Sequence, residues 1–599
     1  MLAAHTDAAQ CPGHFMIRLF TRLRDRIRRR LHDFRLELAR PDAILALSIL
    51  GAIAGVLAAV TIIALRLLVE WGQRTLFPGV PPEQYEGLAP ELRLLAPLGG
   101  GLLIALLFRL TPPDSHRVGV THILERLAYH QGRLPWRNAL VQFVGGAISM
   151  ISGHSVGREG PSAHLGTASS NLPAQMLDLP NNSLRVLAAC GAAAGIAASF
   201  NTPLAGAAFA MEVLLLEYTV AGFAPVILAT VSATTLTRAV FGDDLAYAVP
   251  ALTLGHLTEL PWILFGGVLF GLVGAGFNAL FRTVARQGAH LPEWLRPLLG
   301  GLLVGLCGLA VPAVLGIGDD TVDHLLRGED LVLLSLLLIL VFKIIATAGG
   351  IGLGLPGGAI GPILFIGAVG GALFGLIGAR LGFNAVESIG LYAMLGMGAM
   401  MACTLQAPMA GLIAILELTG NPNFIMPGML AVVAATITAG RVGRRESLFM
   451  GLLRSWGMDY RDDPISQSLR RVGVAGIMNR KVTSLPRIAT AEAVDTALAD
   501  NPTWIVVRDT EGPDILLPAV DLARARKEQP DAESFDLLDI PADRRQGAPI
   551  DLGATLLEAQ QKMAETGADL LYVISQTVPG VPRIYGVIGR EDVESAYRL

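Results

Sequence analysis

The chain has 599 residues, of which 52% are hydrophobic and only 16% are charged, and its mean hydropathy is +0.53. A soluble protein of this length carries about 25% charged residues and divides into several domains, so the composition argues against an ordinary soluble enzyme. Charged residues number 13 in residues 1–40, 39 in residues 41–440 and 44 in residues 441–599. We therefore expect a membrane body followed by a soluble tail. The net charge of -4 is too small to indicate a nucleic-acid partner.

The cysteines give no sign of a disulfide framework or of a metal site. Cys11, Cys190, Cys307 and Cys403 stand far apart and form neither a CxxC motif nor a Cys/His spacing. We predict no bound metal.

A basic segment precedes the first apolar run. Residues 16–40 hold nine arginines and three acidic residues, and the apolar run follows at residues 43–69. Arg441, Arg444 and Arg445 stand at the exit of the last apolar run. Because cytoplasmic loops retain Lys and Arg, we expect both termini in the cytoplasm and an even number of crossings. The basic segment is interpreted as a topology signal, with a lipid-contacting amphipathic helix as the alternative, and no cleavable signal peptide is visible.

The apolar runs between residues 41 and 440 are numerous but irregular. A perpendicular membrane span needs about 20 apolar residues, and several of these runs are shorter or interrupted by Gly and Pro. Broken helices at membrane depth persist only where protein or a watery cavity satisfies their backbone. Their buried ends offer N–H groups to anions. We therefore predict a polytopic all-α membrane protein with broken helices that form a transport path.

The body contains an internal repeat. Residues 203–212 read PLAGAAFAME and residues 408–417 read PMAGLIAILE, and a Gly-Pro pair lies upstream of each, at Gly160-Pro161 and at Gly361-Pro362. The second copies follow the first by 205 and 201 residues. Corresponding Gly/Pro-interrupted segments in two halves point to a binding site in a membrane protein. Parallel and inverted copies look alike in sequence, so the repeat alone does not fix their orientation.

The segment Gly157-Arg158-Glu159-Gly160-Pro161 carries charge at membrane depth. It follows an apolar stretch and precedes a helix whose first turn accommodates Pro161. An ionisable residue at such depth costs at least about 2.5 kcal/mol and is a functional candidate. Glu159, beside a positive helix end, can hold the place of an anion and release it on protonation. We predict a gate that responds to pH and to competing anions; the alternative is a structural ion pair between Arg158 and Glu159.

GREGP, the NTPLAG segment that leads to Glu212, the PGGAIGP loop and a paired C-terminal module together resemble the CLC family of chloride channels and chloride/proton antiporters. The resemblance covers roughly residues 41–599. It implies a homodimer with one anion pathway per subunit and two halves of inverted topology. It makes Glu159 the gating glutamate. It also implies that five backbone N–H groups line the anion sites, those of Gly157, Arg158, Gly160, Ala359 and Ile360.

Three positions near the expected anion sites depart from the family pattern. The first anion loop usually reads GSGIP, with a serine hydroxyl at the central anion site, and an ungapped count back from GREGP puts Val118 at that serine. A register error would put Ser115 there instead. The family's tyrosine at the inner end of the central site corresponds to Phe449, and Ile360 stands where phenylalanine is common. Since valine donates no hydrogen bond, we expect the central site to rely on backbone amides and to bind anions more weakly.

The position after Glu212 bears on the type of transport. Antiporters of the family mostly carry a second carboxylate there as an internal proton acceptor, whereas this chain has Val213. A valine cannot carry a proton, so we predict uncoupled anion conduction, with a chloride/proton antiporter as the alternative and Glu217 as a substitute proton carrier. Glu212 and Glu417 are expected to be structural carboxylates bonded to helix N-termini.

Two further features have competing interpretations. Residues 153–157 (GHSVG) fit the G-x-S-x-G nucleophile elbow, but they lie in a small-residue apolar stretch without the required strand, so an intramembrane serine hydrolase is a remote alternative. Lys343 is the only lysine between residues 41 and 440. We expect it to reach an interface by snorkelling, with tuning of the anion field as the alternative.

From about residue 464 the composition becomes that of a soluble α/β domain. Residues 473–527 and 545–599 share one pattern, in which a helical run is followed by an apolar strand, a second strand and a closing helix. The apolar strands are expected at 504–507 and 570–574. The pattern resembles a pair of cystathionine-β-synthase-type (CBS) modules packed as one unit.

CBS modules often bind adenine nucleotides through a Thr or Ser followed by an Asp at the last strand–helix turn. Asp521 and Asp592 match that Asp, but Pro518 and Gly589 occupy the hydroxyl position. An adenine nucleotide is thus the one cofactor suggested, and no cofactor is required. The alternative is a tail that only stabilises a dimer.

These observations predict a dimeric CLC-type anion channel, not an enzyme, in a bacterial inner membrane. Its expected partners are chloride or other small anions, the lipid bilayer and a second copy of the chain. The expected domains are a basic cytoplasmic segment at 1–40, an anion-conducting membrane domain at 41–455 with halves near 41–240 and 250–450, and a cytoplasmic tandem CBS domain at 464–599.

Overall fold

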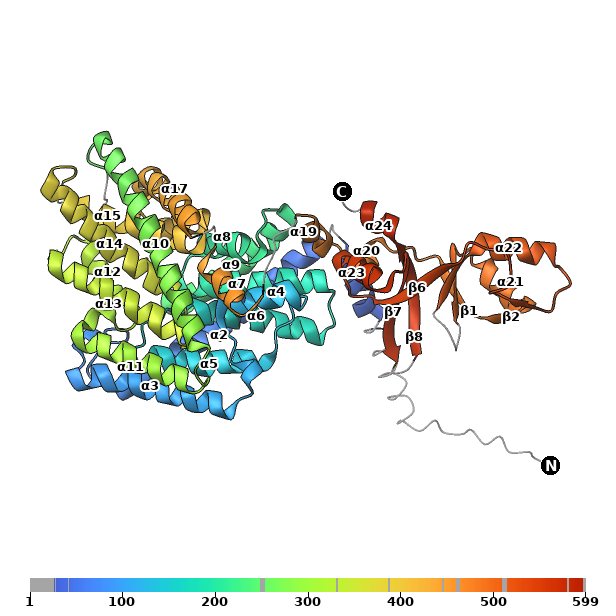
Figure 1. Cartoon of the computed structure of the whole chain (residues 1–599), viewed down its shortest axis with the longest axis horizontal. Helices are drawn as coiled ribbons and strands as arrows, with labels where there is room; N and C mark the ends of the chain where they lie inside the picture. Colours follow the sequence, from blue (N-terminus) through green and yellow to red (C-terminus); the bar gives the residue numbers. More distant parts are fainter. Residues whose placement is uncertain are drawn as a thin grey trace, which may run out of the picture. The chain divides into compact units, whose positions relative to one another are not determined.

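The computed structural model describes residue 26 and residues 29–40, 43–247, 254–329, 332–385, 388–443, 446–458, 464–508, 514–578 and 581–595. Arg28, Arg444 and Arg445, part of the charge pattern used to predict orientation, lie outside these residues. The described chain forms two compact units, drawn in Figure 1. One is a helical body made of residues 44–177 and 184–458, and the other combines the N-terminal segment up to residue 43, residues 178–183 and the tail from residue 464.

The first half of the body consists of helices separated by short turns. Helices α3 and α8 each begin with proline in the first turn, where its missing N–H costs no hydrogen bond. The chain after α8 continues as a π-helical segment, η3. The helices are α2 (Ile44–Leu76), α3 (Pro90–Leu110), α4 (Gly119–Tyr129), α5 (Trp136–Ile151), α6 (Glu159–Met176), α7 (Asn181–Phe200), α8 (Pro203–Phe209), η3 (Ala210–Leu215) and α9 (Val220–Phe241).

The second half repeats this order. Its helices are α10 (Leu260–Gly288), α11 (Leu295–Ala310), α12 (Asp319–Leu326), α13 (Leu333–Gly352), α14 (Ile360–Leu381), α15 (Ile389–Leu405), α16 (Pro408–Thr419) and α17 (Ile425–Val442), and α18 (Leu448–Ser455) follows. Among the described residues, eight helices are long and apolar enough to cross a membrane, and four apolar helices are shorter. The predicted fold class, a polytopic helical body with broken helices, is confirmed.

Equivalent helices pack in equivalent ways. Helix α2 packs on α9 and α10 packs on α17, while α3 lies beside α11, as Figure 1 shows for the α3–α11 pair. Small residues permit the close approach of α3 and α11: a β-carbon on Gly101 would lie 2.6 Å from the carbonyl oxygen of Pro297. The two short helices α4 and α12 contain no continuous apolar run, because only one side of each is apolar.

The tail contains one six-stranded sheet with the order β1-β3-β4-β6-β7-β8. In each module a helix connects two parallel strands, and an antiparallel strand and a closing helix follow. The predicted strands at 504–507 and 570–574 are present as β3 and β7. The elements are α19 (Pro464–Arg471), α20 (Val474–Ile477), β1 (Val482–Pro486), β2 (Ile488–Thr490), α21 (Ala491–Ala499), β3 (Trp504–Arg508), β4 (Ile515–Pro518), α22 (Ala519–Glu528), β5 (Ser534–Asp536), β6 (Arg545–Asp551), α23 (Leu556–Thr566), β7 (Leu570–Val578), β8 (Val581–Gly589) and α24 (Arg590–Ser595).

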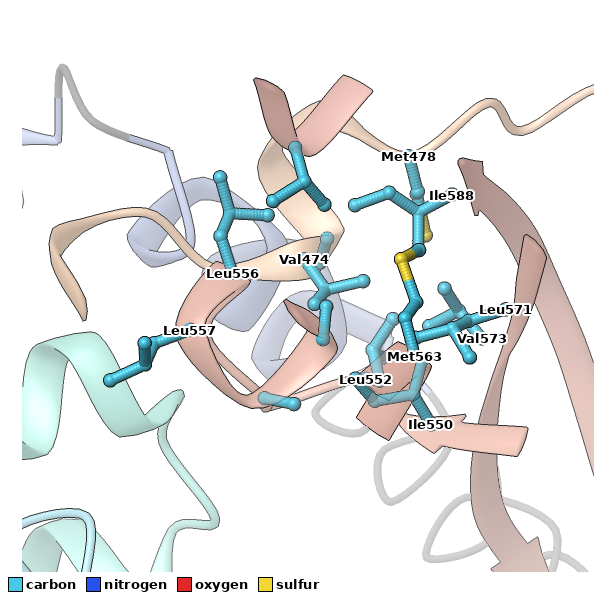
Figure 2. Close-up of a cluster of buried hydrophobic side chains, with 14 of the residues drawn as sticks. Val474, Met478, Ile550, Leu552, Leu556, Leu557, Met563, Leu571, Val573 and Ile588 are labelled. Carbon is cyan, nitrogen blue, oxygen red and sulfur yellow. The ribbon is translucent and has the colours of Figure 1, made fainter. Parts of the chain in front are cut away.

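A buried apolar cluster holds the second module together. Figure 2 shows the side chain of Met563, on α23, beside those of Leu571 and Ile588 of the sheet, with Leu556 in the same cluster next to Val474. Alternate residues of a strand face one side of its sheet, so the apolar residues of β7 meet the apolar face of α23. The C-terminal prediction of an α/β domain is confirmed.

Candidate functional site

The two Gly-Pro loops of the repeat are joined by a backbone pair. The N–H of Gly157 donates to the carbonyl of Gly358 at 2.7 Å, and the N–H of Gly358 donates to the carbonyl of Gly157 at 2.8 Å. Each loop leads directly into a helix, α6 from Glu159 and α14 from Ile360. A β-carbon on Gly160 would lie 2.7 Å from the Cα of Gly358, so this approach requires glycine. The N-termini of α6 and α14 therefore converge on one point inside the body.

The side chain of Glu159 lies at this point and is fully buried. Its Oε1 accepts a hydrogen bond from the N–H of Gly361, in the first turn of α14, at 2.9 Å. Its Oε2 has no hydrogen-bond partner among the described residues. A helix N-terminus carries partial positive charge and uncommitted N–H groups, so it binds anions. The carboxylate of Glu159 thus sits where a free anion would find the same donor.

The other residues expected at the anion sites surround the same point. Arg158 and Ala359 are the N-cap residues of α6 and α14, and Gly160 and Ile360 lie in the first turns. The N–H of Gly157 is already bonded within the protein, because the backbone pair uses it. The interloop pair is the part of this geometry that the sequence alone did not indicate.

The guanidinium of Arg158 turns to carboxylates of other segments. It lies 3.6 Å from Glu83 and 3.8 Å from Asp319, and it stacks over the ring of Phe200 at 5.3 Å. Asp319 also accepts a hydrogen bond from the hydroxyl of Tyr247 at 2.8 Å. The alternative of an ion pair between Arg158 and its neighbour in sequence is therefore wrong, since distant segments supply the carboxylates.

Val118 and Phe449 come from two helices that pack together, α4 and α18. Val118 is the N-cap residue of α4, in an extended conformation, and contributes no side-chain cap. Ser115, the register alternative, is buried with its hydroxyl bonded to the carbonyl of Pro112 at 2.6 Å. Phe449 is buried in the first turn of α18, edge-on to the ring of Phe209. Of these two helices, α18 is capped by the hydroxyl of Ser447, which accepts a hydrogen bond from the N–H of Met450, whereas α4 has no side-chain cap.

Glu212 and Glu417 make reciprocal contacts across the repeat. The carboxylate of Glu212 accepts hydrogen bonds from the N–H groups of Met409 at 3.1 Å and Ala410 at 2.7 Å, at the start of α16. The carboxylate of Glu417 accepts them from Leu204 at 3.0 Å and Ala205 at 2.7 Å, at the start of α8. Such reciprocity is the signature of a two-fold relation. Each half therefore caps a helix of the other.

Val213 is buried within the π-helical turn η3, 4% exposed. Glu217 follows η3, half-buried, and its backbone N–H donates to the carbonyl of Met211. The side chain at position 213 is therefore apolar and faces the protein interior.

The GHSVG motif does not assemble a nucleophile. The hydroxyl of Ser155 bonds to that of Thr347 at 2.9 Å, whereas the ring of His154 bonds to Ser152 and to the carbonyl of Pro97. The motif connects helix α5 to helix α6, so the strand that a nucleophile elbow requires is replaced by a helix.

Lys343 does not snorkel, and that prediction is wrong. Its side chain is 0% exposed. The ammonium donates to the carbonyls of Val314 at 3.1 Å, Gly316 at 2.8 Å and Ile317 at 3.0 Å, in the segment that enters α12, and it lies 4.3 Å from the ring centroid of Phe365. Three carbonyls replace water around the charge, which is why it can stay inside.

Sequence reasoning missed a group of buried polar side chains in the first half. They are Gln142 on α5, Ser162 and His164 on α6, and His122 on α4. The rings of His122 and His164 are joined by a hydrogen bond of 2.8 Å. A signal existed, because these polar residues interrupt apolar or small-residue runs. Their shared location could be seen only once α4, α5 and α6 were packed together.

The two aspartates proposed for the tail lie at the predicted strand–helix turns. Asp521, in the first turn of α22, accepts a hydrogen bond from the N–H of Asp543 at 3.2 Å and lies 3.5 Å from Arg524. Asp592, in the first turn of α24, accepts one from the N–H of Gly589 at 2.8 Å. Both carboxylates are thus engaged locally.

Known proteins share this sequence pattern and fold. The family model described as "Voltage gated chloride channel" matches residues 100–440, a range that includes both Gly-Pro loops and the two reciprocal carboxylates. The chain belongs to the CLC family. It is therefore a multi-pass membrane protein of a family whose members are transporters and channels.

Some relatives within the CLC family are named as chloride channels and others as exchange transporters. A ClcB-like chloride channel protein of Ralstonia nicotianae is 34% identical over 385 residues, which cover 62% of this chain and 87% of the relative. The H(+)/Cl(-) exchange transporter ClcA of Salmonella paratyphi A is 30% identical over 463 residues, which cover 73% and 93%. A solved structure titled as a eukaryotic CLC transporter has a TM-score of 0.60 at 20% identity and covers 92% of this chain and 98% of that one.

Proposed function

We propose that the protein is an anion channel of the CLC type, in which Glu159 gates uncoupled chloride conduction. The observation that carries this proposal is the buried carboxylate at the start of α14, bonded to the N–H of Gly361 through one oxygen and without a partner among the described residues at the other. A permeating anion competes for that N–H. Protonation removes the charge with which Glu159 competes, so conduction rises as the pH falls.

The anion path in this proposal runs past the converging helix ends. Backbone groups of Arg158, Gly160, Ala359 and Ile360 line its outer part, with Gly157 shaping the loop. Val118 and Phe449 line the central site. Helix N-termini supply partial positive charge without a fixed cation, which lets a small anion bind and leave.

Val213 supports conduction over exchange. It is buried and apolar where a proton acceptor would be needed for coupling. The second candidate, a chloride/proton exchanger, is favoured by the relative whose name is an exchange transporter. In that case Glu217, four residues later, is the proton carrier to consider.

The setting we propose follows from charge and from family likeness. The protein is a homodimer in the bacterial inner membrane with both termini in the cytoplasm, and the tail from residue 464 is a tandem CBS domain. The membrane domain occupies about residues 41–455. Adenine nucleotide binding at the tail, through Asp521 or Asp592, is a subordinate proposal.

The test is reconstitution in liposomes. We expect chloride efflux without uphill proton movement, and we expect Glu159→Gln to raise efflux at neutral pH and remove its pH dependence. Proton uptake driven by chloride efflux at a fixed ratio would establish the exchanger instead. Unchanged efflux and pH dependence in Glu159→Gln would refute the gating role.

A further inference from the structure

One buried amide in the first half lacks partners. Gln142, on α5, is 0% exposed, and neither the oxygen nor the nitrogen of its carboxamide has a hydrogen-bond partner among the described residues. Buried polar groups are nearly always bonded, because an unpaired one loses its contacts with water and gains nothing in return. Beside a helix N-terminus, which offers uncommitted N–H groups, a side chain in this condition points to a partner from outside the chain.

In the second half, the residue equivalent to Gln142 is fully hydrogen-bonded. Gln142 lies nine residues before the end of α5 (151 − 142) and Lys343 nine before the end of α13 (352 − 343), so the two are repeat mates. Lys343 holds the segment that enters α12. In the first half Asn138 holds the segment that enters α4, by donating to the carbonyls of Asp114 and Arg117 at 2.9 Å each. Gln142 makes no hydrogen bond to this segment among the described residues.

The carboxamide of Gln142 lies between two helix starts. Its oxygen is 3.9 Å from the position that a β-carbon on Gly119, the first residue of α4, would take. Its nitrogen is 3.2 Å from the corresponding position on Gly146, and the Cγ of Pro161, in the first turn of α6, is also 3.2 Å from that position. Helix α4 spans 11 residues and has no side-chain cap at Val118. An uncapped helix N-terminus and an unbonded amide thus face the same space.

We propose that Gln142 is an anion ligand at the N-terminus of α4 and donates through Nε2 the hydrogen bond that Val118 cannot. This inference rests on the proposed function, since it concerns the central site of that path. A carboxamide can rotate to turn its NH2 group toward either side, and its oxygen and nitrogen are assigned from bonding alone. An anion at the start of α4 selects the orientation with the nitrogen inward.

The chemistry of the site indicates a small inorganic anion such as chloride. Its donors are one neutral amide and backbone N–H groups. Two arginines are next to the helix starts in the chain, and both are paired with carboxylates: Arg117 lies 2.8 Å from Glu125, and Arg158 is held by Glu83 and Asp319. Without a dedicated cation, the site binds an anion weakly enough to release it, which conduction requires. A lysine at position 142, the residue type of its repeat mate Lys343, would add a positive charge and hold the anion more tightly.

Chloride binding to the purified, full-length protein in detergent, measured by calorimetry, tests the proposal together with chloride efflux from liposomes. We expect Gln142→Met to weaken chloride affinity by about tenfold to a hundredfold, as for one lost hydrogen bond to a charged group. Gln142→Lys should strengthen affinity by a similar factor. The matched control is Ser149→Ala, which removes a different buried polar group without a partner among the described residues, the hydroxyl of Ser149 on the same helix, and should leave affinity unchanged.

The results separate this inference from the proposed function. If Gln142→Met and Gln142→Lys both bind chloride as the unaltered protein does, the ligand role is overturned, while a response of efflux to Glu159→Gln still supports gating. If Glu159→Gln has no effect but Gln142→Met weakens binding, the ligand role stands and the gate fails. Should Gln142→Met not fold, Gln142→Asn decides, because the shorter side chain withdraws the same donor; equal affinity there overturns the proposal.

Discussion

The two halves of the membrane body share a frame but differ in their buried polar groups. Both contribute a glycine to the interloop pair, and both contribute a carboxylate that caps a helix of the other half. The chemistry is unequal. Glu159, Ser162 and His164 in the first half have the mates Ile360, Ile363 and Phe365 in the second, 201 residues later (360 − 159, 363 − 162, 365 − 164).

The difference extends to hydrogen bonding. In the first half, Ser162 Oγ, Nδ1 of His164 and both atoms of the Gln142 carboxamide have no partner among the described residues. In the second half, Lys343 is satisfied by three carbonyls. Single polar atoms of Trp262, Asn278 and Asn384 in the second half also lack a partner among the described residues. The symmetric contacts thus build the scaffold, whereas Glu159, Gln142 and His164, on α5 and α6, belong to the first half alone.

The largest expected effect separates the two repeat mates on α5 and α13. Lys343→Met leaves three buried carbonyls without a donor, so we expect a loss of about 2–4 kcal/mol of stability. Gln142→Met removes an amide that has no protein partner and should cost little or nothing. Thermal unfolding of both variants in detergent measures this contrast. Equal losses would mean that the two positions are equivalent after all.

The reciprocal carboxylates should behave alike. Glu212→Gln and Glu417→Gln each lose one charge-assisted acceptor at a helix N-terminus, and we expect each to cost about 1–2 kcal/mol of stability. Glu565→Gln, at an exposed position on α23, serves as the control. Unfolding in denaturant gives the three values. A change in transport confined to Glu212→Gln, without loss of stability, would contradict the symmetric structural role.

The paired loops offer a graded test of the glutamate's position. A β-carbon on Gly358 would meet the carboxylate of Glu159 and lie 2.5 Å from the N of Gly160, whereas one on Gly361 would lie 3.4 Å from Glu159. We expect Gly358→Ala to displace Glu159 and raise chloride efflux at alkaline pH by about fivefold, which corresponds to a shift of about 1 kcal/mol in its position. Gly361→Ala should change efflux less than twofold in this order-of-magnitude comparison. The reverse order of effects would argue against displacement.

The smallest expected effect concerns the uncapped start of α4. Val118→Ser adds a hydroxyl that can donate to an anion, and we expect chloride affinity to rise by about threefold. Calorimetric titration measures it, with Ser115→Ala as the comparison because the hydroxyl of Ser115 is bonded to Pro112. A gain from Val118→Ser that disappears in Gln142→Lys would show that the two positions serve one anion.

Much of the fold could be predicted from pattern. The repeat, its helix boundaries near the Gly-Pro pairs, and the two strands at 504–507 and 570–574 follow from periodicity and from punctuation by Gly and Pro. Helices α4 and α12 could not, because their apolar residues form one stripe on a short helix and leave no continuous run.

The candidate site could also be predicted only in part. Glu159 stood out in the sequence because a charge within an apolar body is costly. The partners of Lys343 were misjudged, because the prediction considered only the nearest membrane interface, whereas the three carbonyls come from a segment that lies far away in the chain. The carboxylates that hold Arg158 likewise come from distant segments, which the sequence did not indicate.

Residue pattern is enough to identify a CLC membrane protein with a two-fold repeat, a charged α/β tail and a glutamate at a helix start. Which buried polar groups have hydrogen-bond partners is known only from the packed fold: Lys343 is satisfied by three carbonyls, and Gln142 by none of the described residues. The reason is physical. Hydrophobic periodicity is a local property that each segment carries alone, whereas hydrogen-bond satisfaction depends on which distant segments are packed together.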